Sequence, residues 1–473
     1  MSALWRRSDL VRATGGSAHG AWQDVSGVVI DSRAAGPGDL FVALHGPNHD
    51  AHAFVGQALA AGAAAALVDR ADDHPSLAGL PVDAALLRVA DTLKGLERIG
   101  VAARARSRAR IAAVTGSVGK TSTKEALRHV LAARAATHAS AASHNNHWGV
   151  PLSLARLPAA ARYGVFELGM NHAGEIAALV ATVRPHVALI TTIAPAHLAF
   201  LGSIEAIADA KAEIFDGLEP GGVAVLPADS PQFERLRARA AAAGATIVTF
   251  GRSATADCRL LHAVSDLSGS DLSVRLHGRM IDLRIGTPGE HGIANALAVL
   301  ATVEALGADP VQAGRSLAEV APAAGRGARV PIRLAGGEAL LIDDSYNANP
   351  VSMAAGLSVL GRASGRKIAV LGDMLELGPE ADRMHAGLLE PIDRQDVDLV
   401  FTVGRHMQAL HDALDAGRRG GHTASSDKMV PLLREMLRPG DTILVKGSLG
   451  SRMKVVVEAL TDGEAAGVRP QAN

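Results

Sequence analysis

The sequence predicts an α/β protein of three domains, whose central domain is a parallel sheet with a phosphate-binding loop. Short apolar runs of strand length alternate with segments of helical spacing along almost the whole chain. The 473 residues suffice for about two to four domains, and 48% hydrophobic residues can form sizeable cores. A glycine-rich loop between one apolar run and one helical segment is the strongest local signal.

Composition and charge exclude several classes of protein. Aromatic residues make up only 3% of the chain, which argues against a nucleic-acid binder that stacks bases on aromatic rings. The formal net charge of −1 gives no overall field that would attract DNA or an anionic membrane. A single cysteine, Cys258, excludes an internal disulfide and a zinc site with several cysteines. No apolar run has the length of a signal-peptide core or a membrane span, so we expect a cytoplasmic protein without membrane insertion.

The first predicted domain covers residues 1–106. It combines an alanine-rich helix over residues 50–61 with apolar strands, which are expected at residues 28–30, 40–44 and 64–68. Asp31, Ser32 and Arg33 follow the first strand, where polar side chains can bind a ligand. The arginine-rich residues 104–110 indicate the end of a helix and the boundary with the next domain.

The second predicted domain covers residues 107–327 and the third covers residues 328–473. In the second, helical segments separate the strands of a parallel sheet, and two alternating runs predict an attached hairpin; the strands are expected at residues 111–114, 164–167, 187–192, 222–226, 245–250, 272–276 and 281–285. The third predicts a doubly wound, Rossmann-like sheet with strands at residues 339–343, 367–371, 399–403 and 442–445. The polar tail after residue 463 is expected to be frayed.

A phosphate-binding loop follows the first strand of the second domain. It consists of Thr115, Gly116, Ser117, Val118, Gly119, Lys120 and Thr121. The glycines let backbone amides converge on phosphate oxygens, and the N-terminus of the helix expected from residue 122 adds a partial positive charge. Lys120 can reach the β- and γ-phosphates of a nucleotide, and the Thr121 hydroxyl can bind Mg²⁺. An ordinary glycine-rich turn is the alternative, but strand, loop and helix are in register for a nucleotide site.

Polar side chains elsewhere in the second domain can complete such a site. Glu167 ends a strand and can hold Mg²⁺ near Thr121. His197 follows the next strand and can bind a second metal ion or orient an acyl phosphate. Asn295 offers both a donor and an acceptor to an adenine edge. Lys211 lies in a helical segment, where a lone lysine is usually solvated, so its spacing alone predicts no function.

Two further groups lie at the second boundary and beyond it. Arg326, in Gly325-Arg326-Gly327, can clamp a γ-phosphate when the domains close, although a plain flexible linker is the alternative. Residues 343–350 follow a strand and carry more hydrogen-bonding groups than a turn needs. Lys446 follows the last strand directly and can bind a carboxylate or a phosphate.

Taken in order, these motifs resemble the Mur ligases, the ATP-dependent amide-bond-forming enzymes of bacterial peptidoglycan synthesis. The resemblance runs from Asp31 to about Glu458, through motifs at residues 31–33, 40–46, 50–52, 115–121, 145–152, 167–171, 196–198, 210–214, 295–297, 325–327, 344–350 and 446–448. It implies a UDP-sugar-binding domain over residues 1–106, an ATP-binding domain over residues 107–327 and a domain that binds the incoming dipeptide over residues 328–473.

The resemblance also implies roles for single residues. ATP and two Mg²⁺ ions are expected, with Thr121, Glu167 and His197 as metal ligands. Lys211 matches a position that family members carry as a carbamylated lysine, a carboxylate-like ligand of the second Mg²⁺. Asn295 and Arg326 match nucleotide-contacting positions, and Asp344 is placed with them. The expected catalytic residues are Lys120, His197, Lys211 and Arg326, and the expected substrate contacts are Ser32, Arg33, Asn145, Asn146, Asn347, Asn349 and Lys446.

Residues 344–350 resemble the family members that add D-alanyl-D-alanine to UDP-N-acetylmuramoyl-tripeptide. The tripeptide-forming members typically carry Tyr-Ala-His there and a later Asp-Asn-Pro-Arg, and this chain has neither. Folylpolyglutamate synthetases share the ATPase but not the domain that contains residues 31–33. Val118 and Gly292 differ from the residues that are frequent in the family, yet neither removes a side chain with an assigned role.

The reaction expected from this resemblance passes through an acyl phosphate. The terminal carboxylate of the UDP-sugar tripeptide attacks ATP, and the dipeptide amine then displaces phosphate. The product is the pentapeptide precursor of peptidoglycan, so the enzyme would serve cell-wall biogenesis, cell shape and cell division. The alternatives are a sibling ligase or a kinase with the same nucleotide site, and a non-catalytic nucleotide-binding scaffold. A monomer is expected, and diaminopimelate and lysine stay open as the third residue of the tripeptide.

Overall fold

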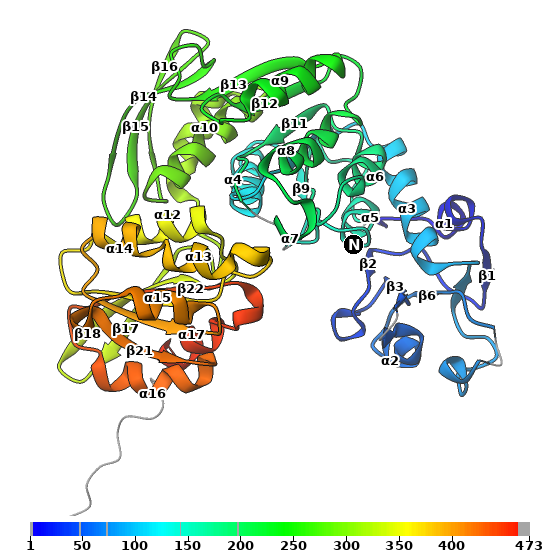
Figure 1. Cartoon of the computed structure of the whole chain (residues 1–473). Helices are drawn as coiled ribbons and strands as arrows, with labels where there is room; N and C mark the ends of the chain where they lie inside the picture. The colour runs from blue at the N-terminus through cyan, green and yellow to red at the C-terminus, as the bar shows by residue number, and fades with distance from the viewer. Residues whose placement is uncertain (1–2, 47–48, 72–73, 142, 196–197, 462–473) are drawn as a thin grey trace, which may run out of the picture.

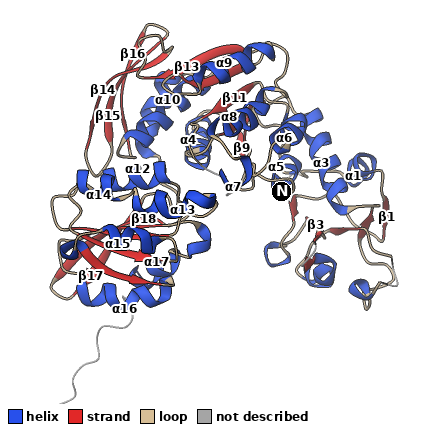
Figure 2. Ribbon diagram, viewed as in Figure 1, coloured by secondary structure: helices blue, strands red, loops and turns tan. Residues whose placement is uncertain are grey.

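The computed structural model describes residues 3–46, 49–71, 74–141, 143–195 and 198–461, and the tail that we expected to be frayed lies outside them. Three sheets follow one another along the chain, and each lies among helices (Figures 1 and 2). This confirms the predicted α/β class. The chain leaves the first sheet through α3 (Thr92–Arg106) and enters the third at β17 (Ala328–Leu334). The predicted boundaries after residues 106 and 327 stay predictions.

The N-terminal sheet has the strand order β1-β7-β6-β3-β2, and its pairs are parallel except β1 with β7. The three predicted strands are confirmed, and the strands are β1 (Ser17–His19), β2 (Gly27–Val29), β3 (Asp39–Val42), β6 (Ala65–Val68) and β7 (Leu86–Arg88). The predicted alanine-rich helix begins as a 3-10 turn, Ala51–Phe54, and continues as α2 (Val55–Ala60). Helix α1 (Arg7–Thr14) precedes the sheet, and β4 (His45–Gly46) pairs with β5 (His49–Asp50) outside it.

The central sheet has the strand order β16-β15-β14-β13-β12-β11-β8-β10-β9. The strands from β9 to β14 pair in parallel, and β15 and β16 extend the sheet as the predicted antiparallel hairpin. The bounds are β8 (Arg110–Thr115), β9 (Thr137–Ala139), β10 (Tyr163–Glu167), β11 (Val187–Ile190), β12 (Val223–Pro227), β13 (Thr246–Gly251), β14 (Cys258–Ser265), β15 (Ser270–Leu276) and β16 (Arg279–Ile285).

Helices cover both faces of the central sheet. One core packs against α4 (Lys120–Ala132), α10 (Glu290–Ala305) and α11 (Pro310–Ser316). The other core packs against α5 (Gly149–Ala155), α6 (Glu175–Val183), α8 (Ile204–Ala212) and α9 (Phe233–Ala242), and the short α7 (Leu198–Leu201) precedes α8. Strand β8 places Ala112 and Val114 in the first core and Ile111 and Ala113 in the second. Burial on both faces explains its uninterrupted apolar sequence.

The C-terminal sheet has the strand order β17-β18-β22-β19-β20-β21, and β17 is its antiparallel edge. The four predicted strands are confirmed as β18 (Gly337–Asp344), β19 (Lys367–Gly372), β20 (Leu399–Val403) and β22 (Thr442–Lys446), while β17 and β21 (Arg419–Thr423) were not predicted. One face packs against α12 (Pro350–Leu360), α13 (Ala381–Ala386), α14 (Leu389–Arg394) and α15 (Met407–Ala413). The other face packs against α16 (Ser426–Met436) and α17 (Lys454–Thr461).

Buried contacts join the N-terminal domain to the central one. The indole nitrogen of Trp5 donates to the Ala155 carbonyl over 2.8 Å, and the Arg156 guanidinium donates to the Val28 carbonyl over 2.6 Å. The Arg106 guanidinium lies 3.6 Å from the centre of the Trp5 ring, so an arginine that the sequence placed at a solvated helix end is part of this junction. Within the described part of the chain, no helix is long and apolar enough to cross a membrane.

Candidate active site

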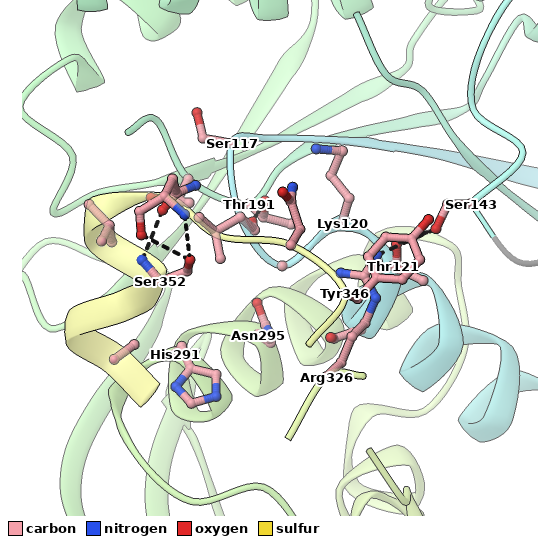
Figure 3. A pocket seen from close by; sticks show the side chains of 18 of the residues that line it. Ser117, Lys120, Thr121, Ser143, Thr191, His291, Asn295, Arg326, Tyr346 and Ser352 are labelled. Carbon is pink, nitrogen blue, oxygen red and sulfur yellow. Dashed lines mark hydrogen bonds between the residues drawn. The ribbon is translucent and has the colours of Figure 1, made fainter. Parts of the chain in front are cut away.

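A cavity with a volume of about 520 Å³ lies between the central and C-terminal domains. Its walls come from the phosphate loop, the loop before α5, the end of β10, the start of α10, the Arg326 linker, α12 and the ends of β18 and β22. Figure 3 shows side chains from several of these elements around one space. The carboxyl ends of strands from two different sheets therefore face the same cavity, where ligands of α/β sheets usually bind.

The predicted phosphate loop begins where β8 ends and becomes α4 at Lys120. Gly119 caps this helix with φ 88° and ψ −9°, a left-handed conformation that favours glycine. Gly116 must be small as well, because a Cβ there would lie 1.9 Å from the Thr191 hydroxyl oxygen. The Lys120 ammonium donates to the Gly116 carbonyl over 2.6 Å, and burial lowers the pKa of Lys120.

Glu167 is the last residue of β10 and is only 1% exposed. Its Oε1 atom accepts a hydrogen bond of 2.7 Å from the Asn145 amide. Its Oε2 atom is buried, and none of the described residues donates a hydrogen bond to it. Buried polar atoms normally have a partner, so an orphaned carboxylate oxygen on a residue that lines the same cavity as Thr121 suits a hard divalent cation.

Lys211 lies on α8 and is 1% exposed. Burial, and then the neighbouring charge of Lys120, lower the pKa of Lys211 well below its usual value. Its environment therefore favours the uncharged amine rather than the solvated ammonium that its helical position alone suggested. His197, the other predicted ligand of a second metal ion, lies outside the described residues. No group of three or more His, Cys, Asp or Glu side chains placed to hold a metal ion occurs in the described ranges.

The nucleotide side of the cavity joins three elements. Asn295 projects from α10 toward the phosphate loop, so that a Cβ on Gly119 would lie 2.4 Å from its Oδ1 atom. The Arg326 guanidinium lies 4.2 Å from the centre of the Tyr346 ring and donates to the Ser143 hydroxyl over 3.4 Å. Sequence reasoning had assigned no role to Ser143 or to Tyr346, although Tyr346 lies inside the quoted motif over residues 344–350.

The C-terminal residues of the cavity are tied to one another. The Lys446 ammonium donates to the Asp344 carboxylate over 2.7 Å and to the Asn347 carbonyl over 2.9 Å. Asn349 caps α12 through reciprocal hydrogen bonds with Ser352. The structure thus brings the predicted residues Asp344, Asn347, Asn349 and Lys446 to the cavity that also contains Lys120 and Glu167.

The other predicted substrate contacts have different surroundings. Ser32 and Arg33 follow β2 in the N-terminal domain and do not line this cavity; the Arg33 side chain is exposed and pairs with Asp31. Asn146 accepts a hydrogen bond of 3.0 Å from the backbone of Gly149, at the start of α5. The Asn145 amide donates a hydrogen bond to Glu167. The substrate roles of these residues stay predictions.

Comparison with known proteins agrees with this arrangement. The chain matches three family descriptions: "Mur ligase family, catalytic domain" over residues 24–127, "Mur ligase middle domain" over residues 114–303 and "Mur ligase, glutamate ligase domain" over residues 325–449. A curated relative from Escherichia coli strain K12, "UDP-N-acetylmuramoyl-tripeptide--D-alanyl-D-alanine ligase", is 36% identical and covers 96% of this chain and 98% of its own length.

Solved structures agree as well. A crystal structure of MurF from Acinetobacter baumannii has a TM-score of 0.84 and 31% identity, and covers 97% of this chain and 99% of its own. MurF ligase from Thermotoga maritima, solved in complex with ADP, has a TM-score of 0.76 and 25% identity, and covers 93% and 97%. These matches confirm the resemblance and the three-domain architecture that the motifs predicted. The chain belongs to the Mur ligase family.

Proposed function

We propose that this protein is the ATP-dependent ligase that joins D-alanyl-D-alanine to UDP-N-acetylmuramoyl-tripeptide and so makes the pentapeptide precursor of peptidoglycan. The observation that carries this proposal is the shared cavity. A phosphate loop and a buried carboxylate lie on one wall, and the Asp344–Asn349 loop with Lys446 lies on the other. Similarity over nearly the full length to the Escherichia coli ligase of that name supports the substrates.

ATP is placed by the phosphate loop. Backbone amides of residues 115–121 and the N-terminus of α4 bind the phosphates, and Lys120 and Arg326 bring positive charge to the transferred phosphoryl group. Asn295 is positioned beside the loop for the adenine edge, and Asp344 stands across the cavity. The ADP complex of the Thermotoga maritima relative supports the choice of nucleotide.

The residues of the cavity fit Mg²⁺, because Thr121 and Glu167 offer hard oxygen donors and one carboxylate oxygen has no other partner among the described residues. When bound, Mg²⁺ neutralises charge on the phosphates. A second Mg²⁺ would be held by His197 and Lys211. Burial lowers the pKa of Lys211, which favours the amine form that reacts with CO₂, and a carbamate at this position would supply an anionic ligand.

The first chemical step brings together two anions, the tripeptide carboxylate and the γ-phosphate. Charge neutralisation must therefore dominate, and Lys120 and Arg326, which both line the cavity, supply it. The step forms an acyl phosphate and ADP. Attack by the dipeptide amine on the acyl carbon forms the amide bond and releases phosphate, while closure between the domains keeps out water that would hydrolyse the intermediate.

The substrate contacts are divided between domains. Ser32 and Arg33 lie on an exposed turn of the N-terminal domain, where they are available to the UDP moiety. Asn347, Asn349 and Lys446 lie in the C-terminal part of the cavity, on the side of the incoming dipeptide. Asn145 and Asn146 lie in the loop before α5, and their side chains make hydrogen bonds within the protein, to Glu167 and Gly149. We place the enzyme in the cytoplasm, where UDP-linked precursors are used, and we propose that it is a monomer.

Phosphate release tests the proposal. Release from ATP and Mg²⁺ should require both UDP-N-acetylmuramoyl-tripeptide and D-alanyl-D-alanine, and Lys120→Ala should lower it on the order of 100-fold or more, the usual cost of one positioned donor. A matched control is Lys94→Ala, because Lys94 is an exposed lysine paired with Glu97 on α3. Release with a different amine acceptor would move the enzyme within the family, and full activity of Lys120→Ala would refute the nucleotide site.

A further inference from the structure

We propose that Asn145 is a positioning residue for the metal-binding carboxylate of Glu167, and not a direct contact of the UDP-sugar peptide. The inference rests on the nucleotide and metal site proposed above. Asn145 lies in the loop between β9 and α5, and its side chain crosses to the end of β10. Its Nδ2 atom donates to Glu167 Oε1 over 2.7 Å, a short hydrogen bond to a buried carboxylate.

This hydrogen bond divides the two carboxylate oxygens between two tasks. Oε1 is bound by the amide, while Oε2 is buried and receives no hydrogen bond from the described residues. A carboxylate held at one oxygen keeps one rotamer and presents the other oxygen in a fixed direction. Ordering of this kind by outer partners is what gives metal ligands their geometry and affinity.

The chemistry of the amide suits the task better than that of a charged donor. An ammonium or a guanidinium at this distance would neutralise Glu167 and compete with a divalent cation for it. A carboxamide donates a hydrogen bond but carries no net charge, so the carboxylate keeps its full attraction for the cation. Lys120, the nearby cation, donates its hydrogen bond to the Gly116 carbonyl, and it acts on Glu167 through its charge alone.

The backbone holds Asn145 in place independently of its side chain. The Gly169 amide donates to the Asn145 carbonyl over 2.8 Å, so the loop and the segment after Glu167 are clamped together. A Cβ on Gly169 would lie 2.8 Å from the Asn145 Cγ atom, which requires glycine at this contact. Nearer β9, the buried Lys124 of α4 donates to the Ser140 carbonyl over 2.8 Å. The phosphate-loop helix thus fixes the same loop.

A substrate contact predicts a different use of the side chain. One amide hydrogen of Asn145 is committed to Glu167, so a contact with the sugar peptide could use only the second hydrogen and the amide oxygen. The adjacent Asn146 is also committed, since its oxygen accepts the Gly149 amide and starts α5. Both side chains therefore make hydrogen bonds within the protein.

The test measures metal binding without turnover. ADP affinity is determined by calorimetry on the full chain at fixed free Mg²⁺ concentrations and in EDTA, for wild type, Asn145→Ala and Asn145→Leu. Both variants keep the backbone clamp, and the leucine keeps the volume. Mg²⁺ is expected to tighten ADP binding, and we compare the Mg²⁺ concentration at which half of this effect is reached. In both Asn145 variants this concentration should rise about 10- to 100-fold, while the ADP affinity in EDTA stays unchanged.

Two further variants sharpen the result. Gly169→Ala pushes on Asn145 from the other side and should shift the Mg²⁺ response in the same direction. Gln232→Ala is the matched control, because it removes an exposed amide–carboxylate hydrogen bond, to Glu205 over 3.3 Å, elsewhere in the central domain, and it should not shift the response.

The outcomes separate this inference from the proposed function. If wild type shows a Mg²⁺ response and the Asn145 variants share it unchanged, the positioning role is refuted while the ligase stands. The same holds if the variants raise only the KM for the UDP-sugar tripeptide, since that identifies a direct contact. If wild type shows no Mg²⁺-dependent binding of ADP, both proposals fail.

Discussion

Substituting Gly119 by alanine should damage ATP binding more than protein stability, and the chain contains a natural control. Gly119 caps α4 with φ 88° and ψ −9°, and Gly174 caps α6 with φ 86° and ψ −17°. An alanine in this left-handed conformation costs about 1–2 kcal/mol at either position. For a domain of this size the melting temperature should therefore fall by roughly 2–8 °C in Gly119→Ala and in Gly174→Ala alike.

The two positions differ in what a new methyl group meets. Nothing lies within 4 Å of a Cβ on Gly174, whereas a Cβ on Gly119 would lie 2.4 Å from Asn295 Oδ1, and ordinary contact begins at 3.4 Å. Asn295 must therefore move by about 1 Å, which would break the hydrogen bond to adenine that we propose for it. Such a bond contributes about 0.5–1.5 kcal/mol, so the KM for ATP should rise about two- to twelvefold in Gly119→Ala only.

Thermal unfolding and the ATP dependence of phosphate release are measured on both variants. Equal melting temperatures with a selective rise in the KM for ATP would support the placement of Asn295 at the nucleotide. An equal rise of the KM in Gly174→Ala would refute the reasoning, because that residue does not line the cavity. An unchanged KM in Gly119→Ala would also refute it.

Three further predictions concern other parts of the chain. Tyr346→Leu removes the ring beneath Arg326 and should lower kcat/KM for ATP about fivefold, the cost of about 1 kcal/mol of cation–π stabilisation, whereas Tyr346→Phe keeps the ring and most of the activity. Lys211→Ala should lower the ligase activity at least about 10- to 100-fold, which is what the loss of an outer partner of a metal ligand usually costs. Added acetate should restore part of this activity, and no rescue by acetate would speak against a carbamate at Lys211. Burial lowers the pKa of His186 to about 4, and its Nδ1 atom accepts the Ile111 amide. The unfolded chain binds more protons between about pH 6.5 and 4, so stability is full above this window and falls as the pH drops through it. In urea unfolding, His186→Gln should lose less stability between pH 7.5 and pH 5 than wild type does. An equal loss of stability in both proteins would show that His186 is not its source.

The sequence predicts those elements whose pattern is local. Strand β8, the glycine loop and α4 could be located because an apolar run, two glycines and a helical period occur in direct succession. The edge strands β17 and β21 were missed, since they contain Pro331 and Gly420 and are only partly buried. Edge strands show a weak alternation of apolar and polar residues, because they have a neighbouring strand on one side only. Their pairing is decided by that neighbouring strand.

Within the site, residue types and positions could be predicted but their partners could not. Asn145 could be recognised as part of a motif, yet its hydrogen bond joins it to Glu167, which lies 22 residues away. The contact between Arg326 and Ser143 spans 183 residues. Such partners depend on how β9, β10 and the C-terminal domain are placed in space. Lys211 shows the same limit, because its burial and lowered pKa are properties of the fold rather than of its helical period.

The linker around Arg326 explains why the cavity needs both domains. Gly325 donates to the Asp343 carboxylate over 2.9 Å and Gly327 donates to the Asp343 carbonyl over 2.7 Å, so the linker is bound to the end of β18. The guanidinium of Arg326 then stacks on Tyr346 of the C-terminal domain and reaches Ser143 of the central domain. Held in this way, Arg326 lies close enough to Lys120 for its charge to lower the pKa of that lysine. The positive charge that the proposed reaction needs, to bring a carboxylate and a phosphate together, is therefore placed where the two domains meet.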